Sequence, residues 1–164
     1  MKTKLALGIL TVAAVFFVMG RATAHQSSHA NLHPQTMKNL STAMHGEAFA
    51  YVKYMLFADH ARQEGNTELA DLFENTAKTE RYEHFAEEAK LAGLVGSDAD
   101  NLRDAIKGES YETTKMYPEF AEQARADGDV AAAQRFEEIA HDEMTHRDAF
   151  QAALTKLEAT AESK

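Results

Sequence analysis

The sequence predicts an all-α protein, an antiparallel four-helix bundle made of a repeated pair of helices. Its 164 residues include only two prolines and eight glycines, and 45% of them are hydrophobic, so one helical domain with a substantial core is expected. Four long segments place apolar residues at alternating steps of three and four, which is the period of an amphipathic helix. Much of this pattern occurs twice along the chain, which indicates that the second pair of helices repeats the first.

The first 24 residues have the composition of a secretory signal. Lys2 and Lys4 precede the apolar run from Leu5 to Met19, and Ala22-Thr23-Ala24 follows as a cleavage site. The run is shorter than the ~20 residues that a spanning helix needs, which favours a cleaved signal over a membrane anchor. We therefore expect residues 1–24 to be removed and the mature protein to be periplasmic or otherwise exported.

The charge of the chain argues against a nucleic-acid partner. Loss of the signal takes the basic count from 17 to 14 against 26 acidic residues, a net charge of −12 with histidine neutral. Such a protein is a poor nucleic-acid binder, and bound cations would offset part of its charge. The sequence contains no cysteine, which excludes disulfides, thiol catalysis and cysteine-ligated iron.

A polar segment, residues 25–35, separates the signal from the helices. His25, His29 and His33 lie four residues apart there, a spacing that could bind metal in a helix. We expect a solvated lead-in instead. The four-helix bundle is then predicted to span residues 36–158, with a short tail over residues 159–164.

Local signals give the ends of the four helices. Pro34 suits a first helical turn, Asn66 is an N-cap, and Pro118 should kink the third helix. The segment between the second and third helices reads as a loop. Helices are predicted over four ranges: about 34–65, 66–93, 101–127, and from Gly128-Asp129 onward.

Each predicted helix carries a glutamate on the apolar stripe that should face the core. Burying a lone carboxylate costs several kcal/mol or more, so such groups are paired, protonated or bound to metal. Apolar residues flank each of these glutamates along its stripe, which argues against side chains that reach water at the bundle ends. Four converging carboxylates predict a metal site. The four are Glu47, Glu80, Glu109 and Glu143.

The spacing of nearby residues matches a site for two metal ions. Such a site takes a single glutamate from each of two helices and a Glu-x-x-His pair from each of the other two, because positions i and i+3 share a helical face. Glu47 and Glu109 are the single glutamates, and Glu143-Met-Thr-His146 is one pair. The second helix departs from the pattern, because Glu83 stands three residues after Glu80 and His84 comes one position later.

The departure leaves two alternatives for the second helix. Either Glu83 binds, or a local bulge brings His84 into the site. A glutamate ligand would make the site richer in carboxylate, which suits a harder, more oxidised metal and should lower its reduction potential. The repeat aligns Glu83 with His146, which favours Glu83.

The repeat also contains one extra residue in the third helix. Glu47 and Glu109 are 62 positions apart, whereas Glu80 and Glu143 are 63 apart. The extra residue falls between Gly108 and Phe120. Because a one-residue insertion in a helix often forms a π-bulge, and such bulges favour functional sites, a π-bulge is predicted in the third helix.

These residues resemble rubrerythrin, a ferritin-like di-iron family, over about residues 36–157. The resemblance implies a ferritin-like bundle in which the extra glutamate, Glu112, is a rubrerythrin feature. It also implies that Tyr54 and Tyr117 line the site, although both positions suit core aromatics equally well. The implied iron ligands are Glu47, Glu80, Glu109, Glu112, Glu143 and His146. The matching stretches are Gly46-Glu47, Ala77-Lys-Thr-Glu80, Gly108-Glu109-x-x-Glu112, Met116-Tyr117-Pro118-Glu119-Phe120-Ala121 and Ile139-Ala140-x-x-Glu143-x-x-His146.

The resemblance implies a non-haem di-iron peroxidase, which reduces hydrogen peroxide to water, and the signal adds the expectation that it is exported. Two iron ions are the expected cofactor, with manganese as the alternative metal, and Glu112 would change its binding as the metal changes oxidation state. Family members often carry a cysteine-ligated rubredoxin domain that supplies electrons, so this chain is expected to use an external donor protein. Two other functions stay open, a ferroxidase or iron-binding protein that uses O2 and a structural bundle without metal.

The connection between the second and third helices predicts a homodimer. In ferritin-like bundles these two helices run parallel, so the segment from Ala92 to Asn101 would have to recover about 30 Å, close to its extended limit. Some members of the family avoid this span by exchanging helix pairs between two chains. A dimer is therefore expected, and domain swapping is one form it could take.

Overall fold

A computed structural model of the chain describes residues 32–162, which are almost entirely helical. The predicted signal and the histidines at positions 25 and 29 lie outside the described residues. None of the described helices combines the length and hydropathy needed to cross a membrane. The helical elements are α1 (Pro34–Gln63), α2 (Thr67–Thr79), η1 (Glu80–His84), α3 (Phe85–Ala92), α4 (Asp98–Tyr111), η2 (Glu112–Met116), α5 (Tyr117–Asp127) and α6 (Val130–Glu162).

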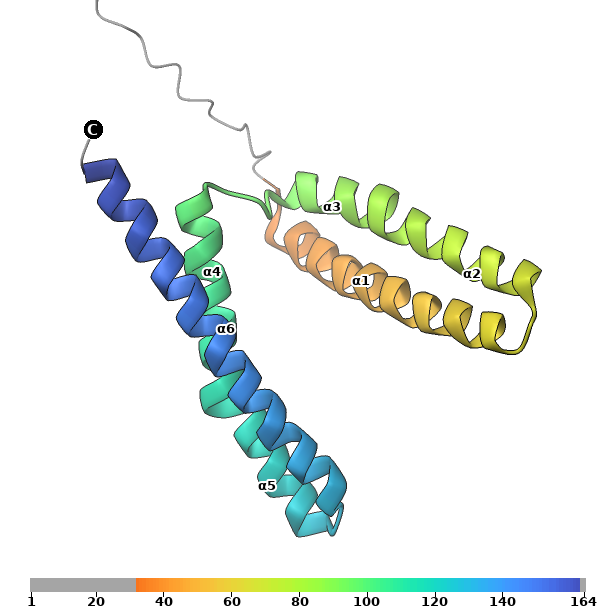
Figure 1. Cartoon of the computed structure of the whole chain (residues 1–164). Helices are drawn as coiled ribbons and strands as arrows, with labels where there is room; N and C mark the ends of the chain where they lie inside the picture. The colour runs from red at the N-terminus through yellow and green to blue at the C-terminus, as the bar shows by residue number, and fades with distance from the viewer. Residues whose placement is uncertain (1–31, 163–164) are drawn as a thin grey trace, which may run out of the picture.

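The first helical pair, hairpin one, consists of α1 packed against the continuous rod α2–η1–α3 (Figure 1). Pro34 occupies the first turn of α1, where its missing N–H is not needed. Gly65 turns the chain with a positive φ of 77°, a conformation that favours glycine. The Asn66 side chain then accepts a hydrogen bond from the backbone N–H of Leu69, which caps α2 as the sequence predicted.

The second pair, hairpin two, consists of the rod α4–η2–α5 packed against α6, an unbroken helix of 33 residues. α4 begins at Asp98, earlier than predicted, because the hydroxyl of Ser97 accepts the backbone N–H of Asp100 and caps the helix. Gly128 turns the chain with a φ of 87°. α6 continues to Glu162 and so includes most of the segment that was expected to be a tail.

The two hairpins repeat one another in detail. In hairpin one the rings of Tyr54, Phe57 and Phe73 pack together, and in hairpin two three rings at equivalent positions do the same. Arg62 pairs with Glu74 near the turn of hairpin one, and an equivalent arginine and glutamate pair near the turn of hairpin two. The all-α fold and the internal two-helix repeat are therefore confirmed.

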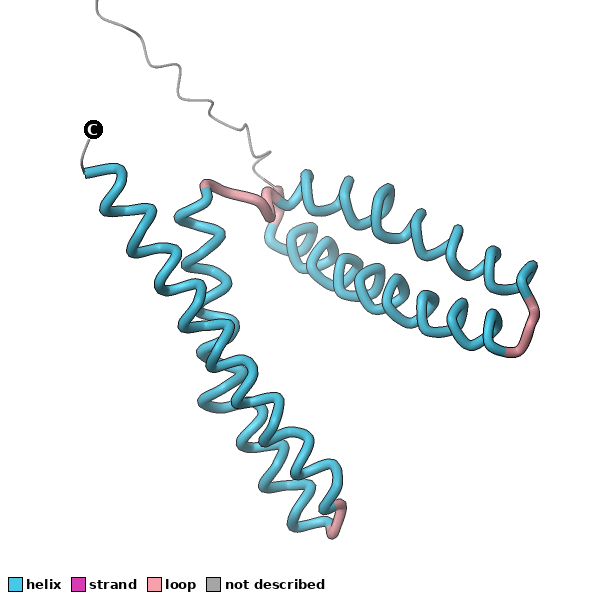
Figure 2. Tube along the Cα trace, viewed as in Figure 1, coloured by secondary structure: helices cyan, strands magenta, loops and turns pink. Residues whose placement is uncertain are grey.

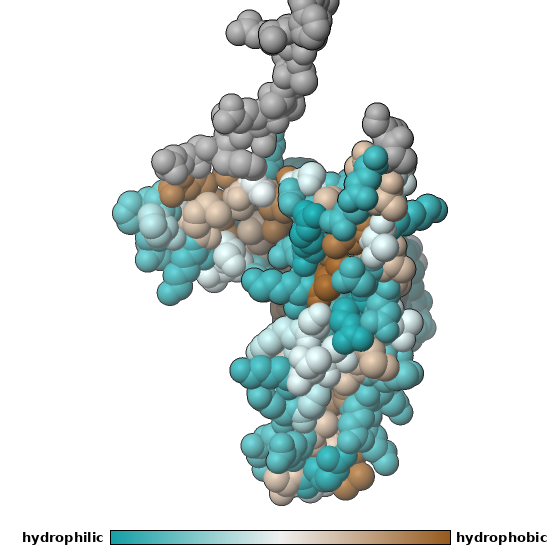
Figure 3. Space-filling view, turned by 90° about the vertical axis from the view of Figure 1, so that its left-hand side faces the viewer, coloured by the Kyte–Doolittle hydropathy of each residue, from teal (hydrophilic) through white to brown (hydrophobic). Residues whose placement is uncertain are grey.

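The core of each hairpin is built from small side chains, which let paired helices lie close together. Large apolar residues remain on the outside, including Phe49 and Leu56 of α1, which are 69% and 63% exposed. Hydrophobic residues therefore show on the surface between hydrophilic ones (Figure 3). The buried residues of the described chain are Met44, Ala58, Ala61, Ala70, Ala77, Ala89, Ala121, Ala124, Ala133 and Leu154.

The four helices of the predicted bundle lie in two hairpins that do not pack on each other within one chain. Only residues 93–97 connect them, and no helix of hairpin one contacts a helix of hairpin two in the described part of the chain (Figures 1 and 2). Five residues span roughly 17 Å at most, far less than a crossover along the bundle requires. No segment of residues 32–162 returns along the bundle, so an exchange of hairpins between two chains remains a prediction.

Candidate metal centre

Hairpin one brings three metal-binding side chains together, and we name them the first cluster. Glu47 comes from the middle of α1, Glu80 begins η1, and His84 ends it. The Nδ1 atom of His84 lies 2.8 Å from Oε2 of Glu80 and 3.9 Å from Oε1 of Glu47. One ligand atom of each residue lies within 4.8 Å of the other two, which is close enough to bind a single metal ion.

Hairpin two contains the same arrangement, the second cluster. It consists of Glu109 from α4 with Glu143 and His146 from α6. The Nδ1 atom of His146 lies 2.7 Å from Oε2 of Glu143, and the carboxyl group of Glu143 also shares a hydrogen bond with Glu109. The sequence predicted Glu143 and His146 from the Glu-x-x-His spacing and Glu109 as one of the two single glutamates.

The π-turn η1 bears on the two alternatives for the second predicted helix. Because a π-turn holds one more residue than an α-turn, the fourth residue after Glu80 takes the direction that the third residue after Glu143 takes in the regular helix α6. His84 therefore joins the first cluster, and Glu83 is not part of it. The geometry favours His84, whereas the repeat had favoured Glu83.

The predicted π-bulge in the third helix is confirmed, because η2 spans Glu112–Met116. The Thr113 hydroxyl donates a hydrogen bond of 2.7 Å to the backbone carbonyl of Ala140, which anchors the bulge against α6. Glu112 stands at its first position, close enough to the second cluster for its charge to raise the pKa of Glu109. The bulge thus brings the additional family glutamate near the second cluster.

The two predicted tyrosines occupy equivalent places in the hairpins. Tyr117 follows η2 directly, and its pKa is raised by burial and by the charges of Glu112, Glu143 and Glu109. Its phenol therefore stays protonated and can donate a hydrogen bond toward the second cluster. Tyr54 packs on Phe73 with ring centroids 6.2 Å apart, so its observed contacts are those of a core aromatic.

The electrostatics of both clusters favour a bound cation. Burial raises the pKa of Glu47, and a hydrogen bond and the charge of Glu80 raise it further. Burial also raises the pKa of Glu109, with the same two contributions from Glu143. Carboxyl groups that repel one another in this way are stabilised by a shared positive ion.

These shifts predict opposite effects of pH on the metal-free and metal-loaded proteins. A carboxyl group whose pKa is raised on folding stabilises the fold at low pH, and this contribution is lost as pH rises from the ordinary glutamate value of 4.5 through the raised value. The hydrogen bond with Glu143 raises the pKa of His146 above 6.5, which extends the same trend to higher pH.

Thermal melting from pH 4.5 to 7.5 tests this prediction. The metal-free protein should lose stability as pH rises, whereas the metal-loaded protein should gain it because protons no longer compete for the ligands. Replacing Glu47 and Glu109 together by glutamine should flatten the profile of the metal-free protein. Parallel profiles for the two forms would contradict the prediction.

The donor atoms fit a pair of iron ions. Carboxylate oxygen and imidazole nitrogen are ligands that suit iron and manganese, and a glutamate from each of two helices with a Glu–His pair from each of the other two is the ligand set of a di-metal carboxylate centre. The two clusters together supply that set. In this chain the two clusters lie on separate hairpins.

The chain is similar in sequence to a known protein family and to several of its members. The family model described as Rubrerythrin matches residues 38–154. Rubrerythrin of Porphyromonas gingivalis is 38% identical over 136 residues, which cover 76% of this chain and 68% of that protein. Nigerythrin of Nitratidesulfovibrio vulgaris is 32% identical over 142 residues, covering 79% and 70% of the two chains. A solved structure of partially reduced nigerythrin has 31% identity and a TM-score of 0.40, over 80% of this chain and 72% of that one.

Proposed function

Because the chain belongs to the rubrerythrin family, we propose that it is a peroxidase that reduces hydrogen peroxide to water at a di-iron centre. The observation that carries the proposal is the pair of matching clusters, each with two glutamates and a histidine held within 4.8 Å. Reduction of one peroxide molecule takes two electrons and two protons and yields two molecules of water. An external donor protein would restore the two electrons.

The residues of the chain would divide the work in the following way. When bound, the iron pair supplies the two electrons that reduce the oxygen–oxygen bond. The glutamates and histidines of the two clusters would hold the ions and fix their spacing. Glu112, at the start of η2, is placed to approach the second cluster as the charge there changes. The protonated phenol of Tyr117 can donate a hydrogen bond to a substrate oxygen.

A homodimer with exchanged hairpins is part of the proposal. The first cluster and the second cluster lie on hairpins that do not pack together in one chain, so neither cluster has its other half. Packing hairpin one against hairpin two of a second chain would complete two centres and bury exposed apolar side chains such as Phe49 and Leu56. Export is also proposed, on the signal-like residues 1–24, and a mature chain beginning at His25 in the periplasmic fraction would support it.

Anaerobic rapid mixing tests the proposed activity. The diferrous protein should be oxidised by hydrogen peroxide much faster than by O2, and an added reductant should return it to the diferrous form for repeated turnover. The opposite order, with O2 reacting much faster, would contradict the peroxidase and support the alternative, a ferroxidase or iron-binding protein of metal homeostasis. The test compares two oxidants on one sample, so the protein is its own control.

A further inference from the structure

Glu88 in α3 is a carboxylate that none of the expected interactions explains. Its Oε2 atom is buried and makes no hydrogen bond to any described residue. Its charge also acts on Glu47, which places it beside the first cluster. A buried carboxylate oxygen without a partner is costly, so it calls for a cation or a hydrogen-bond donor.

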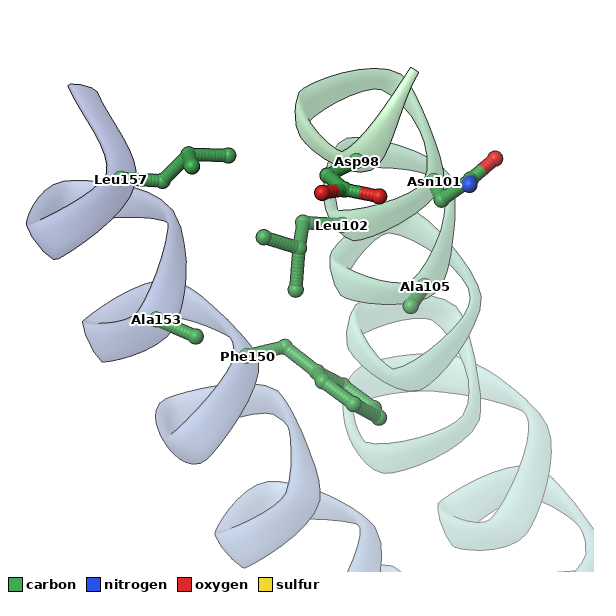
Figure 4. Close-up of a pocket in the computed structure, with 7 residues that line it drawn as sticks. All are labelled: Asp98, Asn101, Leu102, Ala105, Phe150, Ala153 and Leu157. Atoms are coloured by element: carbon green, nitrogen blue, oxygen red, sulfur yellow. The ribbon is translucent and has the colours of Figure 1, made fainter. Parts of the chain in front are cut away.

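The equivalent position in hairpin two shows that a carboxylate is not needed there for packing. Glu88 lies four residues after His84, and Phe150 lies four residues after His146. Figure 4 shows the ring of Phe150 extending from α6 toward α4, where it lines a groove with Leu102. Hairpin two thus fills with an apolar ring the place where hairpin one holds a carboxylate. A purely structural role would be served better by the apolar side chain.

His84 offers the donor that Glu88 lacks. Its Nδ1 atom faces Glu80 and Glu47, so a metal ion bound there leaves the Nε2–H on the other side of the ring. Residues four apart on a helix are neighbours, which puts Glu88 within reach of that ring. Histidines that bind metal commonly donate their second N–H to a carboxylate, which fixes the ring and makes it a better ligand.

We propose that Glu88 is a positioning residue for the metal ion of the first cluster, accepting the Nε2–H of His84 and offsetting the charge of the ion. The two metal positions are then unequal, because Phe150 gives His146 no such partner at the equivalent position. This inference rests on the metal centre of the proposed function, though not on its peroxidase activity.

Iron binding by the full-length Glu88→Gln variant tests the inference. Anaerobic titration with Fe(II) against a competing chelator should show one of the two iron ions bound about 10- to 100-fold more weakly, with the other unchanged. The Mössbauer spectrum of the 57Fe-loaded protein should change for one iron only. Glu87→Gln is the matched control, because Glu87 is the exposed neighbour and its loss changes the net charge equally.

The stability of the metal-free protein separates this role from a structural one. Glu88→Gln should leave the metal-free melting temperature unchanged or raise it, because the charge on a carboxyl group with one buried, unpartnered oxygen is removed. The inference is overturned if the variant binds both ions as tightly as Glu87→Gln, or if weaker binding comes with a destabilised metal-free protein. Full iron binding by the unmodified chain without peroxide turnover would overturn the proposed function and leave the role of Glu88 standing.

Discussion

Replacement of Glu143 by alanine is expected to remove iron from the centre and to lower peroxide turnover by at least about a hundredfold. Glu143 interacts with both of the other members of the second cluster. Its Oε2 atom lies 2.7 Å from Nδ1 of His146, and its carboxyl group shares a hydrogen bond with Glu109. Its loss therefore takes away the carboxylate around which the other two ligands are arranged. A metal ion held by the remaining pair would lose both charge compensation and geometry.

The fold is expected to survive this replacement. The contacts of Glu143 are with the other two residues of the second cluster, and its removal relieves a repulsion that, together with burial, raises the pKa of Glu109. Iron content by elemental analysis, peroxide turnover and helicity by circular dichroism are the measurements. Glu138→Ala is the matched control, because Glu138 is an exposed glutamate on the same helix that pairs with Arg135 and lies outside the second cluster. A variant that keeps its full iron content would contradict the role given to Glu143.

The corresponding replacement in hairpin one, Glu80→Ala, is expected to be equally severe. The Oε2 atom of Glu80 lies 2.8 Å from Nδ1 of His84, and its carboxyl group shares a hydrogen bond with Glu47. Glu80 therefore has the same central position in the first cluster. Equal losses from replacements on two hairpins that do not pack together in one chain would show that both clusters serve one centre. Loss of only one of the two iron ions in each variant would show independent single-metal sites.

The sequence predicted most of the residues that the two clusters bring together, because their chemistry conflicts with their position. Glu47 and Glu109 interrupt apolar stripes, and a carboxylate on such a stripe needs a partner. The π-bulge η2 was also predictable, since an insertion of one residue within a helix must be absorbed by the backbone. Both inferences depend on periodicity, which a single sequence records well.

The choice between Glu83 and His84 could not be made from periodicity. The two residues are adjacent, and which of them faces Glu47 depends on whether the backbone takes an α-turn or a π-turn after Glu80. The amino-acid sequence alone does not show which of these two turns forms after Glu80. Periodicity does not distinguish Glu88 from Glu87 either, because the two look alike in a glutamate-rich helix, whereas in the structure Glu87 is exposed and Glu88 has a buried oxygen.

Two inactive variants, each with substitutions in a different hairpin, are expected to regain iron binding and peroxide turnover when they form a dimer together. One chain would carry Glu47→Ala with Glu80→Ala, and the other would carry Glu109→Ala with Glu143→Ala. Alone, each variant has no complete centre, because every centre in it lacks one cluster. In a dimer with exchanged hairpins, the intact hairpin two of the first chain meets the intact hairpin one of the second. One complete centre forms, and the other centre combines both damaged clusters.

The iron content and peroxide turnover of the co-expressed pair, purified through a different affinity tag on each chain, measure this directly. A centre built from two chains predicts about half of the wild-type iron and half of the wild-type rate in the mixed dimer, against almost none in either variant alone. If each chain closed its own bundle, every centre in the mixed dimer would contain one damaged cluster. Iron content and turnover no higher than those of the separate variants would therefore contradict a centre assembled from hairpins of two chains.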